Sequence, residues 1–142
     1  MTPPLDGMIL PGVTRDSVLS LAKGHVSKTL PLKGLPEKFT VSERQITMKE
    51  VKAASKNGTL VELFGTGNGS SPFSRDILTT LYTGTAAIIC PVDRIGYMGE
   101  DIDVPAGDDS TGLGPVSGVM LAEITGRQLG TIPSDWCVVV AE

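Results

Sequence analysis

The chain has 142 residues, of which 40% are apolar and 20% charged, as is usual for a folded globular domain. Its net charge of −4 and the lack of a lysine- or arginine-rich stretch exclude a nucleic-acid-binding face. No apolar run is long enough to cross a bilayer, so no membrane segment is expected. The two cysteines, Cys90 and Cys137, form neither a disulfide framework nor a metal motif, which favours a reduced, intracellular protein.

A first helix is expected to begin near Thr14, whose hydroxyl can serve as the N-cap. Asp16 lies in the first turn, and Leu21 and Ala22 follow at helical spacing. Gly24 is expected to end this helix. Taken together, these signals predict one helical segment close to the N-terminal end of the sequence.

The next elements are a loop, a strand and a second helix. Residues 24–38 carry glycines, prolines and lysines without periodicity, so a surface loop is expected. Phe39–Arg44 alternates in the manner of a strand. Thr47 and Glu50 have the spacing of a capping box, which predicts a helix through Ser55.

The second half of the sequence alternates strands, turns and one helix, and this alternation favours the α/β class. The expected elements are buried strands at Leu60–Phe64 and Ala86–Val92, a hairpin over Ile95–Val104 with its bend at Met98–Asp101, a loop over 105–114, a helix over Pro115–Arg127 and a closing strand at Trp136–Val140. Pro115 suits the first position of its helix because proline lacks the N–H that is unpaired there.

Two short segments could bind an anion. At Gly12-Val13-Thr14 a helix start offers free N–H groups and the positive end of the dipole, and the Thr14 hydroxyl adds a donor. At Thr85-Ala86 successive amides could form a concavity, with the Thr85 hydroxyl as a further donor. Taken alone, a plain capped helix and a tight turn are the simpler interpretations.

Other conspicuous residues favour ordinary structural roles. His25 has no acid or cysteine near it in sequence and is expected to be a solvated loop residue. Cys90 lies in an apolar run and is expected to pack as a small hydrophobic residue, and Trp136 is expected in the core. The aspartates near Asp101 and Asp108 lack the spacing and closing glutamate of a calcium loop, so no metal is predicted.

In their order, eight stretches resemble the branched-chain amino acid aminotransferases, which are class IV aminotransferases with the fold-type IV pyridoxal-phosphate architecture. The stretches are Thr2–Gly7, Ile9–Arg15, Val41–Arg44, Glu62–Gly67, Gly84–Ala87, Cys90–Val92, Gly114–Val116 and Ser134–Trp136. Each is modest alone, but their ordered sum is specific and covers almost the whole chain.

The resemblance implies a C-terminal cofactor-phosphate-binding domain over residues 1–142, with a mixed sheet, of the D-amino acid aminotransferase-like fold truncated at its N-terminus. It implies pyridoxal 5′-phosphate as cofactor, bound at Val13, Thr14 and Thr85. It further implies that Thr85 and Ala86 face the substrate carboxylate. The implied partners are leucine, isoleucine or valine and 2-oxoglutarate, and family members are homodimers.

One departure from the family concerns catalysis. The family's Schiff-base lysine lies upstream of the segment that matches Thr2, and no lysine here stands in the family's Lys-x-x-x-Asn-Tyr context. Transamination needs that amine, so we expect no catalytic residue and no turnover by the chain alone. A non-catalytic truncated module, or a relative of the D-amino acid aminotransferases and aminodeoxychorismate lyases, is the alternative. Any targeting peptide would precede Met1, so mitochondrial and cytoplasmic locations are both open.

A second departure is an insert. The family runs from the segment matching Gly67 directly into that matching Thr85, whereas residues 68–84 separate them here. The segment lacks periodicity and its borders repeat the dipeptide Thr-Gly, which favours a retained in-frame intron. A true insertion with a regulatory role is the alternative.

Overall fold

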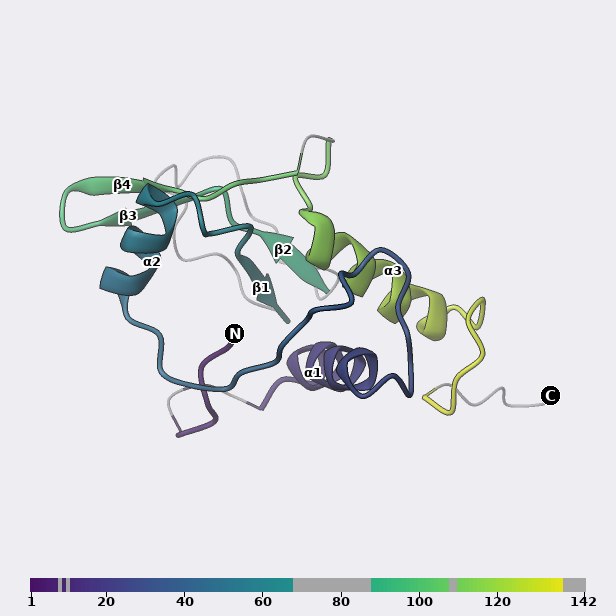
Figure 1. The fold of residues 1–142 in the computed structure, drawn as a ribbon. Coiled ribbons are helices and arrows are strands. Elements are labelled where there is room, and N and C mark those ends of the chain that lie inside the picture. Colours follow the sequence, from purple (N-terminus) through teal and green to yellow (C-terminus); the bar gives the residue numbers. More distant parts are fainter. Residues whose placement is uncertain (8, 10, 68–87, 108–109, 137–142) are drawn as a thin grey trace.

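The structure is a computed structural model that describes residues 1–136 except 8, 10, 68–87 and 108–109. The described elements, in chain order, are α1 (Val13–Val26), α2 (Met48–Lys56), β1 (Phe64–Thr66), β2 (Ile89–Pro91), β3 (Arg94–Tyr97), β4 (Glu100–Asp103) and α3 (Pro115–Gln128). This mixture of helices and short strands agrees with the α/β class (Figure 1). None of the described helices is long and apolar enough to span a membrane.

Among the described residues, the strands form two separate antiparallel pairs, whereas one mixed sheet was expected. β1 pairs with β2, with Thr66 opposite Ile89. β3 pairs with β4 across a two-residue turn at Met98 and Gly99, both of which have positive φ, and this confirms the predicted hairpin.

The strand predicted at Phe39–Arg44 is wrong. The only ladder contact described there is a parallel bridge between Thr2 and Glu43. Alternation along the sequence favours an extended backbone, but a strand also requires a partner of matching length. Here the described partner extends over a single residue.

The first helix begins two residues earlier than expected and ends two residues later. Gly12 is the N-cap, so the assignment of Thr14 to that position is wrong, and Thr14 is the second helical residue. α1 continues through Gly24 to Val26. A Cβ on Gly24 would lie 3.1 Å from Cβ of Leu30, so this glycine accommodates the returning chain instead of ending the helix.

The predicted capping box of α2 is confirmed. The Thr47 hydroxyl accepts from Glu50 N, and the Glu50 carboxylate accepts from Thr47 N at 2.9 Å. α2 has no fully buried residue and is attached to β4 by side chains: Lys52 pairs with Glu100, and Ser55 Oγ donates to the Asp103 carbonyl at 2.7 Å.

The core lies between α1, α3 and the β1–β2 pair (Figure 1). Its fully buried members are Leu21, Ala22, Leu32, Leu35, Ile89, Met120 and Ile124. α3 begins at Pro115 as predicted and contributes Met120 and Ile124 to this cluster. The expected surface loop over residues 24–38 is therefore wrong in part, because Leu32 and Leu35 of that stretch are buried.

His25 is half-buried in the last turn of α1, whereas a solvated loop residue was expected. Its Nδ1 accepts a hydrogen bond from Leu32 N at 3.0 Å, and its Nε2 lies 3.2 Å from the Pro36 carbonyl oxygen. The ring also packs edge-on against Phe39. This histidine thus holds the loop that delivers Leu32 to the core.

Trp136 is also not a core residue. It is 48% exposed, and the guanidinium of Arg127 lies 5.7 Å from its ring centroid. The remainder of the strand predicted at Trp136–Val140 lies outside the described residues. Cys90 is half-buried at the centre of β2, opposite Gly65.

Candidate functional site

The predicted site residues Val13 and Thr14 form the first turn of α1. Gly12 precedes them in an extended conformation with φ −72° and ψ 132°, and no side chain caps this helix. The first backbone bond of the helix runs from Asp16 N to the Gly12 carbonyl. In the described part of the chain, the N–H groups of Val13, Thr14 and Arg15 therefore have no acceptor.

A cavity of about 290 Å³ adjoins this helix start. It is lined by Leu5, Pro11, Gly12, Val13, Arg15 and Asp16. A Cβ on Gly12 would meet nothing within 4 Å, and Val13 is 81% exposed, so the first turn is accessible. Free amides at a positive helix end are suited to a phosphate group.

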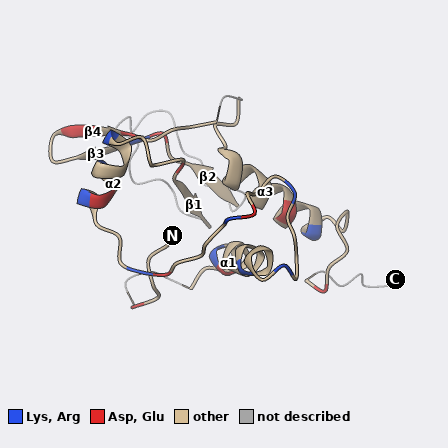
Figure 2. Cartoon of the chain, in the orientation of Figure 1, with Lys and Arg blue, Asp and Glu red and all other residues tan. Residues whose placement is uncertain are grey.

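Arg15 anchors the first turn of α1 to the segment around Glu43. Its guanidinium donates to the Glu43 carboxylate at 3.0 Å and to the Pro3 carbonyl, and its Nε is buried without a hydrogen-bond partner. Lys23 also donates to Glu43, at 3.0 Å. The hydrogen bonds from Lys23 and then from Arg15 hold the pKa of Glu43 below its ordinary value. Figure 2 shows basic and acidic residues interspersed in this region.

The other two predicted site residues, Thr85 and Ala86, lie outside the described residues. In the sequence they come shortly before β2, and next to that strand Gly67 N donates to the Ile88 carbonyl at 3.3 Å. Ile89 of β2 packs in the same core as Leu21 and Ala22 of α1. The helix that begins at Val13 and Thr14 thus shares its core with β2.

A contact that the sequence analysis missed joins Glu62, two residues before β1, to the start of α3. The carboxylate of Glu62 accepts hydrogen bonds from Val116 N at 2.6 Å, from Ser117 N at 3.2 and 3.3 Å, and from Ser117 Oγ at 2.6 Å. It caps the positive end of a helix whose own N-cap, Gly114, has no side chain. The sequence signal for this contact was the pair Gly114-Pro115 at the helix start. Glycine has no side chain to cap the helix, so the first N–H groups of α3 need an acceptor from another segment.

The two glycine-initiated helices therefore differ in the state of their first amides. At α3 the amides of Val116 and Ser117 are satisfied by an internal carboxylate. At α1 the corresponding amides, those of Thr14 and Arg15, and also the amide of Val13 have no acceptor in the part of the chain that the structure describes. Of these two helix starts, α1 is the one that can accept an external anion.

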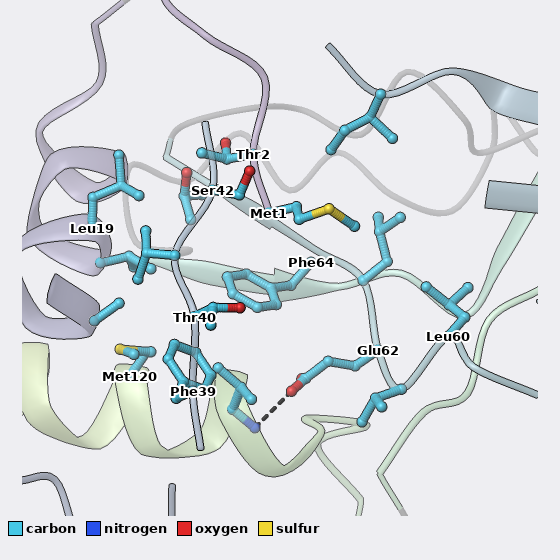
Figure 3. Close-up of a pocket in the computed structure, with 18 of the residues that line it drawn as sticks. Met1, Thr2, Leu19, Phe39, Thr40, Ser42, Leu60, Glu62, Phe64 and Met120 are labelled. Carbon is cyan, nitrogen blue, oxygen red and sulfur yellow. Dashed lines mark hydrogen bonds between the residues drawn. The ribbon is translucent and has the colours of Figure 1, made fainter. Parts of the chain in front are cut away.

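A larger cavity of about 570 Å³ lies beside Glu62 (Figure 3). Most of its wall is apolar, with Phe39, Phe64 and Met120 among the lining residues. Met1 and Thr2 also line it, and Figure 3 shows them on the side opposite Met120. The first residues of the chain and the core formed by α1 and α3 thus line the same cavity.

Comparison with known proteins shows first which class of enzyme the chain is similar to: the similar proteins are aminotransferases. More narrowly, they are branched-chain-amino-acid aminotransferases. The cytosolic protein of Saccharomyces cerevisiae is 39% identical over 145 residues, covering 100% of this chain and 31% of that protein. The protein of Monosiga brevicollis is 35% identical over 141 residues, covering 99% and 28%. The cytosolic protein of Mus musculus is 33% identical over 137 residues, covering 96% and 28%.

The chain therefore belongs to the branched-chain-amino-acid aminotransferase family and corresponds to a C-terminal part of it. It spans less than a third of the length of these curated relatives. No family model matches the chain. The relatives include proteins named as cytosolic and as mitochondrial, which agrees with the expectation of an intracellular protein in either compartment.

Proposed function

We propose that this chain is the part of a branched-chain-amino-acid transaminase that binds the phosphate of pyridoxal 5′-phosphate. In this proposal the whole protein moves an amino group between leucine, isoleucine or valine and 2-oxoglutarate, and it acts as a homodimer. The observation that supports the proposal best is the accessible, uncapped start of α1 at Val13 and Thr14.

The residues at the start of α1 fit a phosphate. The N–H groups of Val13 and Thr14 have no acceptor among the described residues, and the Thr14 hydroxyl is one further donor. Several charge-assisted bonds have to act together, because the helix dipole alone contributes only about 0.3–1 kcal/mol. We assign a further phosphate contact to Thr85, and we propose that Thr85 and Ala86 face the substrate carboxylate.

When bound, the cofactor supplies an electron sink for the carbon that carries the amino group. In this proposal the chain binds the phosphate of the cofactor and thereby orients the cofactor. None of its seven lysines has the family's sequence context, so the chain alone does not transaminate. Incubation with leucine, 2-oxoglutarate and cofactor is the direct test, and turnover above background would refute this part of the proposal.

In the same proposal, residues 1–142 form the C-terminal domain of the D-amino acid aminotransferase-like fold, with residues 68–84 as an insert. The register of the β1–β2 pair supports the insert. Because Gly67 and Ile88 are already hydrogen-bonded across the pair, removal of 68–84 would leave Thr85-Ala86-Ala87 as a three-residue connection. Three residues are an ordinary length for a hairpin loop. Transcripts that join Gly67 directly to Thr85 would support a retained intron.

Substitution of Val13 by proline tests phosphate binding, because it removes one N–H and little else. Val13 is the first helical residue and is exposed, and the preceding Gly12 has the extended ψ that proline requires. α3 already begins with Pro115 at the equivalent position, so the helix tolerates the change. Val13→Ala is the matched control, since it keeps the N–H.

The ligand for this test is pyridoxamine 5′-phosphate, which has no aldehyde to react with surface lysines. Loss of one hydrogen bond to a charged group costs about 1.5–3 kcal/mol, so Val13→Pro should weaken binding by roughly 10- to 150-fold. Val13→Ala should bind as the original chain does. Equal affinity of the two variants in calorimetry would contradict a phosphate site at this helix start. Pyridoxamine without phosphate should not bind at all.

A further inference from the structure

We propose that the 570 Å³ cavity is an interface for an extended apolar segment that enters beside Met1 and runs parallel to residues 38–42. The occupant is the stretch that lies directly ahead of the matched region in the longer protein. The inference rests on the proposed function, in which this chain is one part of a longer transaminase chain, and the curated relatives are in fact more than three times as long.

The backbone around Thr2 is the start of a parallel ladder. Thr2 N donates to the Ser42 carbonyl at 3.0 Å, and Arg44 N donates to the Thr2 carbonyl at 3.0 Å. In a parallel ladder the next residue to bond is two positions earlier, which is the residue directly ahead of Met1. Its N–H would donate to the Thr40 carbonyl and its carbonyl would accept from Ser42 N. Neither of these two groups has a partner within the described ranges.

The cavity specifies the side chains of the entering segment. Successive side chains of an extended chain point to opposite faces, so the second and fourth residues ahead of Met1 share its face. Met1 lines the cavity, together with apolar side chains such as Phe39, Val41, Leu60 and Phe64 (Figure 3). Apolar residues at those two positions would therefore cover this apolar wall and remove it from water.

A second copy of this chain is the competing occupant, and the described strands do not favour it. β1 to β4 contain three or four residues each, and all four are already paired within the chain. From the described residues, a second copy thus offers only the free edges of strands three or four residues long. Continuation from Thr2 extends a ladder that has already begun and needs no loop.

The test is a set of three chains that carry five extra residues ahead of Met1. The first extension, Lys-Val-Thr-Val-Thr, places valines at the second and fourth positions. The second, Lys-Val-Pro-Val-Pro, keeps the valines but lacks the N–H groups that would donate to the carbonyls of Thr40 and Lys38. The third, Lys-Asn-Thr-Asn-Thr, keeps those N–H groups but replaces both valines. The measurements are hydrogen exchange of the Ser42 and Thr40 amides, binding of an apolar dye, and molar mass by sedimentation.

Only the first extension should slow exchange of the Ser42 and Thr40 amides, by about tenfold or more, and reduce dye binding relative to the unextended chain. Equal behaviour of the three extended chains, or no change in any of them, would overturn the proposal. A dimer of the unextended chain in which the Ser42 amide is already protected would assign the cavity to a second copy and would also overturn it. No phosphate or cofactor enters this experiment, so its outcome is independent of whether α1 binds phosphate.

Discussion

Substitution of Gly114 by alanine probes the contact between Glu62 and α3. A Cβ at this position would collide with Oε2 of Glu62, and it would lie 2.7 Å from Cδ and 3.0 Å from Cβ of the same side chain. The backbone at Gly114, with φ −77° and ψ −178°, suits any residue, so the collision is the main obstacle. Alanine would push the Glu62 carboxylate away from Val116 and Ser117.

The expected magnitude follows from two opposing effects. Replacing glycine by alanine at a compatible backbone position stabilises a protein by about 0.4–1 kcal/mol, because the unfolded chain loses freedom. Loss of hydrogen bonds to a charged acceptor costs about 1.5–3 kcal/mol each, and Glu62 accepts from three donor groups. Because the site is half-buried, water can take the place of Glu62 in some of these hydrogen bonds, which reduces the cost. We therefore expect Gly114→Ala to lower the free energy of unfolding by about 2–3 kcal/mol.

The assay is urea unfolding of Gly114→Ala beside a matched control, Gly12→Ala. Gly12 is the N-cap of α1 just as Gly114 is the N-cap of α3, so the local effect of placing alanine at an N-cap is common to both variants. A Cβ on Gly12 meets nothing within 4 Å. Equal stability of the two variants would refute the role of Glu62. In a Glu62→Ala background, Gly114→Ala should cost no more than Gly12→Ala.

Three further predictions concern acidity, the insert and catalysis. Hydrogen bonds from Lys23 and then from Arg15 lower the folded-state pKa of Glu43, so its stabilising effect is complete above the unfolded-state pKa and is lost as the pH falls through the folded-state pKa. Glu43→Gln should therefore reduce the acid sensitivity of unfolding, and an unchanged pH profile would count against this ion pair. Deletion of residues 68–84 should preserve the β1–β2 pair, as judged by protection of the Val92 amide, which donates to the Leu63 carbonyl, and loss of that protection would show that the insert is needed for the fold. The chain should show no transaminase activity until a segment with the family's lysine is supplied, and activity of the chain alone would contradict the assignment.

Elements specified by neighbouring residues could be predicted from the sequence. The capping box at Thr47 and Glu50, the proline that begins α3 and the hairpin around Met98 and Gly99 all depend on contacts within a few residues. Their energetics are local, so the sequence contains the whole signal. The sequence also places the start of α1 to within two residues.

Contacts between distant segments could not be predicted in the same way. The hydrogen bonds from Leu32 N to His25, and from Ser117 to Glu62, depend on how the chain folds back on itself. The extended segment at Phe39–Arg44 likewise lacks a strand partner of equal length among the described residues. Of the predicted site, Val13 and Thr14 lie together on an accessible helix start, whereas the contacts of Thr85 and Ala86 stay a prediction.

The central claim is that the amides at the start of α1 bind the cofactor's phosphate. The most direct measurement is a titration of the ¹⁵N-labelled chain with pyridoxamine 5′-phosphate, with inorganic phosphate and with phosphate-free pyridoxamine, observed at the amides of Val13 and Thr14. We predict that both phosphate-containing ligands shift these two amides while pyridoxamine leaves them unchanged. Shifts confined to other parts of the chain, or equal shifts with pyridoxamine, would contradict the claim.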